Sequence, residues 1–419
     1  MLRKYNTVVF FFFIFALVIS SAYGQTDPQE LDDYIFKLAV FGPSEDIFVW
    51  WGHAALIVED TRWNYSRAFD WGIFYYPSDN FLKDFIKEQV RYRVTAGYFN
   101  IREYTDEDRD ITIYTLDLDR AAKERMISYA QNIVLPENCY YDYHEFRDNC
   151  ATGVRDIIDL GIQGQLKASF GDAPGRFTKR EHVLRFSWSR PFSNWFLGFL
   201  MGQDLDRQIT QWDEMFLPVE IARNIADFTY TDDSGDSRKL VSSAQIINSS
   251  KNRPPVLNAP LVTWPFFLAA GLMAAAVIFL IRAGQAKNIR LCRELLGLIQ
   301  ALLGLFLGLS GSVLVFGLFF MSNDYIQQNI NILFFNPFLL IIAPLGILSA
   351  TKKSFYVNPD KLLGILWTYV SFAGSLTVLA RALPFFYQQN QSVQALIIPV
   401  AFALSEIPFP RLLQPQKDA

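Results

Sequence analysis

The stretch that decides the fold of the N-terminal half of the chain is RDNCATGVRDII, residues 147–158. From position 154 onward its apolar residues recur at the spacing of one helix face, and Asp148 or Asn149 precedes them as a natural N-cap. Cys150 therefore falls in the first turn of the predicted helix. Backbone N–H groups and the positive end of the helix dipole stabilise a thiolate at that position.

The chain has only three histidines, His53, His144 and His182, that could serve as the base for such a thiolate. His53 begins an apolar stretch at 52–58 that predicts a β-strand, and residues 69–75 predict another. A strand histidine facing a helix-start cysteine is a usual arrangement for thiol acyl transfer. His144 is an alternative base, but its tyrosine-rich neighbourhood favours a packed aromatic segment. The competing interpretation is that Cys150 and His53 are only packed residues.

Composition and spacing exclude other kinds of site. The net charge is -4 and no basic run occurs, so the chain is not expected to bind nucleic acid. Neither HxxxH nor CxxC spacing occurs, and no metal or other cofactor is expected. With three cysteines a disulfide framework is excluded, although Cys139 and Cys150 could still bridge in an oxidising compartment.

The N-terminus predicts export of the chain. Residues 1–24 have the three parts of a signal peptide: Arg3 and Lys4, an apolar stretch at 8–20, and small residues at 22–24. Polar sequence follows at once, which favours cleavage over a retained membrane anchor. Residues 25–231 have the composition of an α+β domain, with a further strand expected at 111–118 and a helix at 120–133.

The C-terminal part of the chain predicts a membrane domain. Residues 232–256 contain turn-forming sequence and end near Pro254-Pro255, so they are interpreted as a linker. Within residues 257–412, apolar stretches at 261–281, 296–320, 332–350, 362–384 and 394–410 predict an all-α bundle of about five transmembrane helices. The fifth stretch is short and contains two prolines. Basic residues gather in alternate loops, which places the first domain outside the cytoplasm.

One apolar segment in the outer domain has two interpretations. Residues 195–201 are strongly apolar but too short to span a bilayer. They predict either a core helix or a groove for an acyl chain at the membrane surface.

The order of these motifs resembles a known group of enzymes. A histidine-bearing strand, a strand with a polar residue and a later Asn-Cys at a helix start are similar to circularly permuted papain-like enzymes of the lecithin:retinol acyltransferase kind. Residues 51–58, 69–74, 81–85 and 147–155 more closely resemble the bacterial Lnb family, and so does the C-terminal region, including residues 331–340. The resemblance implies a permuted papain-like domain followed by the helical bundle.

The same resemblance implies the activity and the site. Lnb proteins are understood as lipoprotein N-acyltransferases, so the implied partners are a phospholipid acyl donor and a diacylated lipoprotein acceptor. By position, Cys150 is the nucleophile, His53 the general base and Asp70 the group that orients the histidine. Relatives often have Tyr-Asn-Tyr-Gly where this chain has FDWG at 69–72, and an aspartate can hold an imidazole as an asparagine does.

The expected protein is thus a thiol-dependent acyltransferase of the bacterial inner membrane, with its catalytic domain on the periplasmic side. Two alternatives remain from the sequence. One is a papain-like peptidase or amidase acting on the cell wall, and the other is a membrane scaffold without enzymatic activity.

Overall fold

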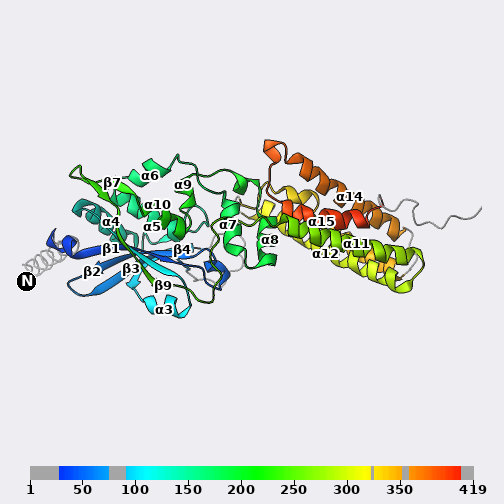
Figure 1. Cartoon of the computed structure of the whole chain (residues 1–419), viewed down its shortest axis with the longest axis horizontal. Helices are drawn as coiled ribbons and strands as arrows, with labels where there is room; N and C mark the ends of the chain where they lie inside the picture. Colours follow the sequence, from blue (N-terminus) through cyan, green and yellow to red (C-terminus); the bar gives the residue numbers. More distant parts are fainter. Residues whose placement is uncertain (1–27, 75–90, 322–324, 352–357, 407–419) are drawn as a thin grey trace, which may run out of the picture.

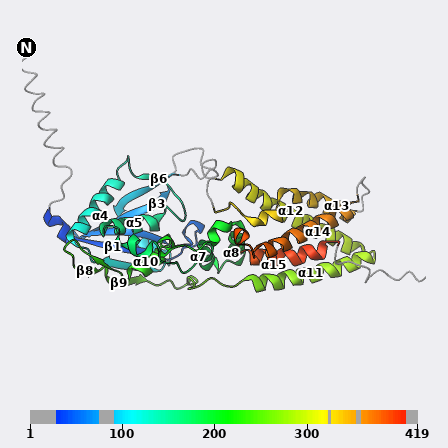
Figure 2. The ribbon, with the colours of Figure 1, turned by 90° about the horizontal axis from the view of Figure 1, so that it is seen from above.

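The computed structural model describes residues 28–74, 91–321, 325–351 and 358–406. The molecule is elongated, with a mixed α/β sheet domain at one end and a helical bundle at the other (Figures 1 and 2). Helices α7 (Lys179–Ser187) and α8 (Pro191–Leu200) lie between the two parts. The predicted signal peptide and the 81–85 segment lie outside the described residues.

In the described residues, the sheet domain is built on seven antiparallel strands in the order β6-β4-β3-β2-β1-β5-β9. The strands of this sheet are β1 (Tyr34–Phe41), β2 (His53–Asp60), β3 (Tyr65–Phe74), β4 (Arg91–Tyr98), β5 (Ile111–Leu116), β6 (Tyr140–Asp142) and β9 (Val241–Asn248). A separate hairpin pairs β7 (Thr229–Thr231) with β8 (Ser237–Lys239). The strands expected at 52–58, 69–75 and 111–118 are confirmed as β2, β3 and β5.

Alternating side chains give the sheet two buried faces. One face packs under α4 (Arg120–Ile133), α5 (Cys150–Gly161) and α10 (Pro218–Ile225), and it forms the main core with residues such as Leu38, Leu56 and Ile157. The opposite face carries a smaller core, including Phe41 and Ile57, against α3 (Ile101–Asp106) and its neighbours. The helix expected at 120–133 is α4, and Asp119 caps its first turn.

The segment at 232–256 is not the linker that the sequence predicted. It contains β8 and β9, and β9 adds an edge strand to the sheet by pairing with β5. Most of the β9 side chains are exposed, so the strand lacks the polar–apolar alternation that marks a half-buried strand. Its backbone pairing with β5, rather than a buried face, holds it in place.

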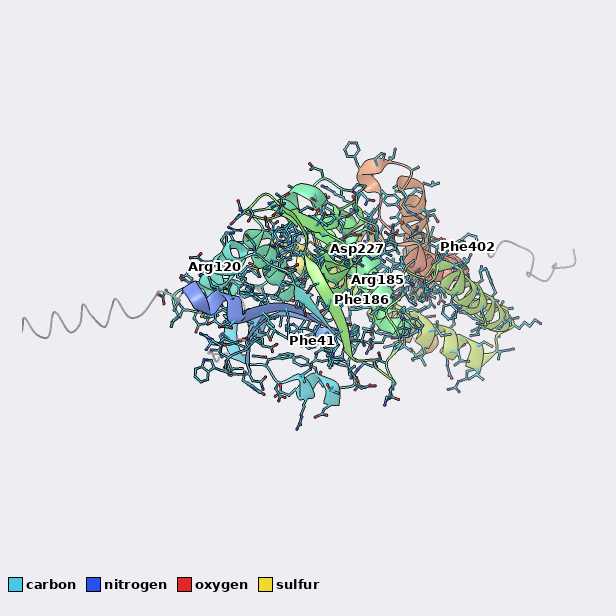
Figure 3. All side chains as sticks on the ribbon, turned by 60° about the vertical axis from the view of Figure 1, so that its left-hand side comes forward. Phe41, Arg120, Arg185, Phe186, Asp227 and Phe402 are labelled. Atoms are coloured by element: carbon cyan, nitrogen blue, oxygen red, sulfur yellow. The ribbon has the colours of Figure 1, made fainter. Side chains whose placement is uncertain are left out.

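The part between sheet and bundle consists of short helices. They are α7, α8 and η3 (Gln203–Asp206), whereas α6 (Gln165–Phe170) and α9 (Gln211–Glu214) pack beside α5 and α10 on the sheet domain. Figure 3 shows Arg185 and Phe186 of α7 in the middle of the molecule, between Phe41 of the sheet and Phe402 of the bundle. Trp195 and Phe199 of α8 are buried in the core of the bundle, which favours the core-helix interpretation of residues 195–201.

Within the described part of the bundle, three helices are long and apolar enough to cross a membrane. They are α11 (Trp264–Ala286), α12 (Arg290–Phe320) and α14 (Pro359–Ala380). The third predicted stretch, 332–350, is not one long helix. Asn336 and Pro337 interrupt it, and a 3₁₀ turn, η5 (Pro337–Ile341), leads into the short α13 (Ile342–Thr351). The fifth stretch forms the short α15 (Gln391–Leu404).

Small residues let these helices approach closely. A Cβ on Gly297 of α12 would lie 2.5 Å from the carbonyl oxygen of Gly346 in α13, and a Cβ on Gly346 would lie 2.5 Å from that of Gly297. Contacts of this kind replace the hydrophobic effect as the basis of helix packing in lipid.

Candidate active site

The start of α5 is fixed by its N-cap. The Asn149 side chain accepts hydrogen bonds from the N–H groups of Ala151 and Thr152, and the Thr152 hydroxyl accepts one from the N–H of Asn149. The Asn149 amide group also donates to the carbonyls of Glu145 and Phe216. This reciprocal cap confirms the predicted helix start, with Cys150 as its first residue.

A glycine brings this helix close to the sheet. A Cβ on Gly153, one turn into α5, would lie 2.5 Å from the buried Trp71 ring of β3. The Trp71 ring of β3 can therefore pack against α5 only because residue 153 has no side chain. On β3 itself, Gly72 has a φ of +88° at an irregularity of the β3–β4 pairing, and a Cβ there would lie 3.8 Å from that of Cys150.

His53 begins β2 directly after a backbone turn. Gly52 has a φ of +84°, and a Cβ there would lie 2.6 Å from the Phe41 carbonyl oxygen, so only glycine fits. The His53 ring stacks on Phe41 with 5.9 Å between ring centres. These contacts fix the direction in which the imidazole leaves the strand.

Asp70 on the neighbouring strand β3 faces this imidazole. Its Oδ1 lies 2.8 Å from His53 Nε2, and both side chains are largely but not fully buried. No other group among the described residues donates a hydrogen bond to this oxygen. The position expected for the orienting carboxylate is therefore occupied by a carboxylate in contact with the ring.

Cys150 is the third member of the cluster. Burial alone would lower the pKa of His53, but the charges of Asp70 and Cys150, and hydrogen bonds with both, raise it well above its ordinary value of 6.5. A histidine with this environment is stabilised as an imidazolium, which is the natural counter-ion of a thiolate. The structure thus brings together the three side chains that the sequence singled out, from two strands and one helix start.

The other two histidines are held elsewhere. His144 accepts a hydrogen bond from the N–H of Phe146, and its ring contacts Arg147 in the same loop. His182 is fully buried with Glu214. The structure therefore favours His53 over His144 as the base that belongs to Cys150.

Two tyrosines near the thiol were missed by the sequence analysis as site residues. Burial raises the pKa of Tyr141, and the charge of Cys150 raises it further; the same two causes act on the pKa of Tyr143. Both hydroxyls therefore stay protonated beside the sulfur. The Tyr141 hydroxyl is buried near Gly72, and no residue that the structure describes forms a hydrogen bond of normal geometry with it. Three tyrosines at 140, 141 and 143, shortly before a helix-start cysteine, were the available signal.

The site lies at the end of the sheet domain that faces the bundle. Trp51 and Phe146, which precede His53 and Cys150 by two and four residues, pack against residues of α7, α8 and Tyr325. Figure 1 shows α7 and α8 on this side of the sheet. The three cysteines are free thiols, so the disulfide considered between Cys139 and Cys150 is absent from the structure. Within the described residues no cluster of metal-binding side chains occurs.

Comparison with known proteins identifies the domain that carries this site. Residues 21–179 match the family model of the Lnb N-terminal periplasmic domain, which confirms the resemblance seen in the sequence for that domain. The match ends at Lys179, the first residue of α7, and does not include the bundle. No curated protein and no solved structure matches the chain. The match and the three long apolar helices together indicate a membrane protein with a periplasmic N-terminal domain.

Proposed function

From the premise that residues 21–179 form an Lnb-family periplasmic domain, we propose that this protein is a lipoprotein N-acyltransferase of the bacterial inner membrane. The observation that carries the proposal is the cluster of Cys150, His53 and Asp70 at a capped helix start. A packed, inert cysteine does not need a histidine whose charge is supported by a carboxylate. The order of strand histidine, strand carboxylate and helix cysteine also supports a permuted papain-like fold.

In the first half of the reaction, the Cys150 thiolate attacks an ester carbonyl of a phospholipid. The carbonyl π electrons move to oxygen, and the protonated Tyr141 or Tyr143 hydroxyl donates a hydrogen bond to that oxyanion. When the intermediate collapses, the ester C–O bond breaks. The leaving alkoxide takes a proton from the His53 imidazolium, which gives a lysophospholipid and a Cys150 thioester.

In the second half, the free α-amine of a diacylglyceryl-cysteine lipoprotein attacks the thioester carbonyl. His53, now neutral, takes the amine proton while the C–S bond breaks and the thiolate returns. An amide replaces the thioester, so atoms and charge balance over the cycle without a cofactor. Asp70 holds the imidazole in place in both halves and stabilises its charged form.

A lipid substrate is favoured by the surroundings of the site. The loop that precedes His53 includes the exposed Phe48, and Arg190 at the start of α8 lies over the Trp50 ring at 4.3 Å. Phe192, in the first turn of α8, is also exposed. Exposed aromatic side chains beside a membrane bundle are typical of contact with lipid headgroups. A cell-wall peptidase would need an open polar cleft on the side away from the bilayer.

The decisive experiment detects the acyl-enzyme. Purified full-length protein is incubated with phospholipid and no acceptor, and its intact mass is measured. We expect one added acyl chain, released by hydroxylamine and absent from Cys150→Ala. Cys139→Ala is the matched control and should form the adduct normally, because Cys139 is a buried thiol outside the cluster.

Acylation of Cys139 instead would refute the assignment, and cleavage of peptide cross-links without an adduct would favour the hydrolase. An unaltered lipoprotein N-terminus in cells lacking the protein would favour a scaffold.

A further inference from the structure

The outer end of the bundle holds two adjoining cavities that have Gln203 and Gln328 in both their walls. One, of about 250 Å³, is lined mostly by apolar side chains, including Leu314, Leu318 and Leu333. The other, of about 540 Å³, is lined by polar and charged side chains together with aromatic ones, including Asp206, Arg207, Arg381 and Tyr387. An apolar space beside a polar one matches an amphiphilic ligand.

The polar cavity carries a positive charge, on Arg381, that no carboxylate in the described part of the chain neutralises. Asp206 already pairs with the buried Arg180, at 2.6 Å. Arg207 pairs with Asp204, also at 2.6 Å. Arg381 has no carboxylate partner among the described residues, and its buried Nε has no hydrogen-bond acceptor there. A buried donor without an acceptor costs free energy, so an anionic ligand that accepts a hydrogen bond from it would stabilise the site.

The charge lies at the depth of lipid headgroups. Arg381 directly follows the apolar helix α14, at the end of the bundle nearest the sheet domain. The turn after it exposes Leu383 and Phe385, and the Tyr387 ring lies under the guanidinium at 5.7 Å. Apolar and aromatic side chains at the end of a membrane span, together with arginine, are typical of the headgroup region.

We propose that these cavities bind one phospholipid from the leaflet on the sheet-domain side, with its phosphate at Arg381 and an acyl chain in the apolar cavity. A diacylglyceryl group without phosphate would fill the apolar space but leave the arginine unpaired, so a phosphate-bearing lipid is the better match. The charge of the phosphate complements Arg381, and the arginine fork suits its oxygens.

The cavities are continuous with the packing around the candidate active site. Tyr325, next to the cavity residue Ile326, lies against Phe146 with 6.4 Å between ring centres, and Phe146 is four residues before Cys150. If the protein carries out the proposed acyl transfer, this lipid site would hold the phospholipid donor next to the candidate active site. That last step rests on the proposed function, whereas the binding site itself does not.

The test measures binding without catalysis. Full-length Cys150→Ala protein is titrated with dioleoylphosphatidylglycerol, and bound lipid is counted by native mass spectrometry. Adding Arg381→Gln should weaken the tightest site by about 10- to 100-fold, the usual effect of losing a charge-assisted hydrogen bond. Arg290→Gln is the matched control, because Arg290 is an exposed arginine at the opposite end of the bundle. It should leave the affinity unchanged. If Arg381→Gln does not fold, Arg381→Lys keeps the charge without the fork and should weaken binding less.

The outcomes separate the lipid site from the proposed activity. Equal affinities for the parent and both arginine variants would overturn the site. So would equally tight binding of dioleoylglycerol, because that lipid has no phosphate. Weaker phospholipid binding after Arg381→Gln, together with no thioester on Cys150 of the unaltered protein, would keep the site and refute the acyltransferase.

Discussion

Two histidine–carboxylate pairs in this protein have almost the same length and opposite settings. His53 Nε2 lies 2.8 Å from Asp70 Oδ1, and His182 Nε2 lies 2.9 Å from Glu214 Oε1. The first pair keeps some exposure and adjoins a helix-start thiol. The second is fully buried, and Arg185 donates a hydrogen bond to the other ring nitrogen, Nδ1. The distance between histidine and carboxylate is therefore not what marks a reactive site.

The neighbours of each ring explain the difference. In His182, Nδ1 accepts from Arg185, so the ring proton lies on Nε2 and points at Glu214. Burial opposes ionisation of Glu214, but hydrogen bonds from His182 and from the N–H of Phe177 hold its pKa below the ordinary value. Every polar group of this pair is occupied by the protein. His53, by contrast, faces a thiol that is only partly buried.

The largest effect expected from this comparison is on the rate of His53→Ala. Loss of a general base should slow thioester formation by about 10²–10⁴-fold. At pH 9 the variant should unfold at nearly the parental temperature, because His53 is not part of a saturated buried network and its pairing with Asp70 stabilises the fold mainly at lower pH. Acyl-enzyme formation is followed by intact-protein mass spectrometry. A parental rate would show that His53 is only a packed residue.

The matched variant His182→Ala should behave in the opposite way. It leaves the buried charges of Glu214 and Arg185 without their shared partner, which should lower the free energy of unfolding by about 3–5 kcal/mol. The protein that remains folded should form the thioester at the parental rate. Denaturant unfolding followed by tryptophan fluorescence measures the first quantity. Parental stability would mean that the network contributes little.

A smaller effect is expected at the orienting carboxylate. Asp70→Ala removes a charge-assisted contact and should slow the reaction by about 10- to 100-fold. Asp70→Asn should react more slowly than the parent but faster than Asp70→Ala, since an amide oxygen can still fix the ring. Rates of acylation for the two variants and the parent make the comparison. Equal rates for all three would remove Asp70 from the site.

The smallest effect is a pH dependence of stability. The pKa of His53 is raised in the folded protein, so His53 adds to the free energy of unfolding. This contribution is fully present below pH 6.5 and is lost as the pH rises through the pKa that His53 has in the folded protein. Asp70→Asn removes a main cause of that shift. It should therefore lower the unfolding temperature more at pH 5.5 than at pH 9.

Asp227→Asn is the control for this measurement, because Asp227, labelled in Figure 3, belongs to an exposed ion pair with Lys239. Its effect should be small at both pH values. A loss for Asp70→Asn that grows toward alkaline pH would contradict the direction of the His53 shift.

Local chemistry made much of the candidate site predictable. The Asn149 cap and the apolar face of α5 lie within a dozen residues, so the helix start at Cys150 followed from the sequence alone. The same is true of α4 and of the apolar strand β2. Length and composition found three long apolar helices among the described residues, whereas the Asn336–Pro337 interruption shortened the third predicted stretch and the fifth forms only the short α15.

What depends on pairing between distant segments was decided only by the tertiary structure. Strand β9 was missed because its position comes from hydrogen bonds to β5 and not from a buried face of its own. The tyrosines beside Cys150 were missed because β6 reaches the site only by pairing with β4. The sequence alone determined the helix start, the candidate side chains and the apolar spans, since each depends on neighbours in the chain. The sequence did not determine that His53 lies beside the thiol, or that both ring nitrogens of His182 are occupied by Glu214 and Arg185. Both depend on contacts between residues far apart in sequence, which only the folded structure sets.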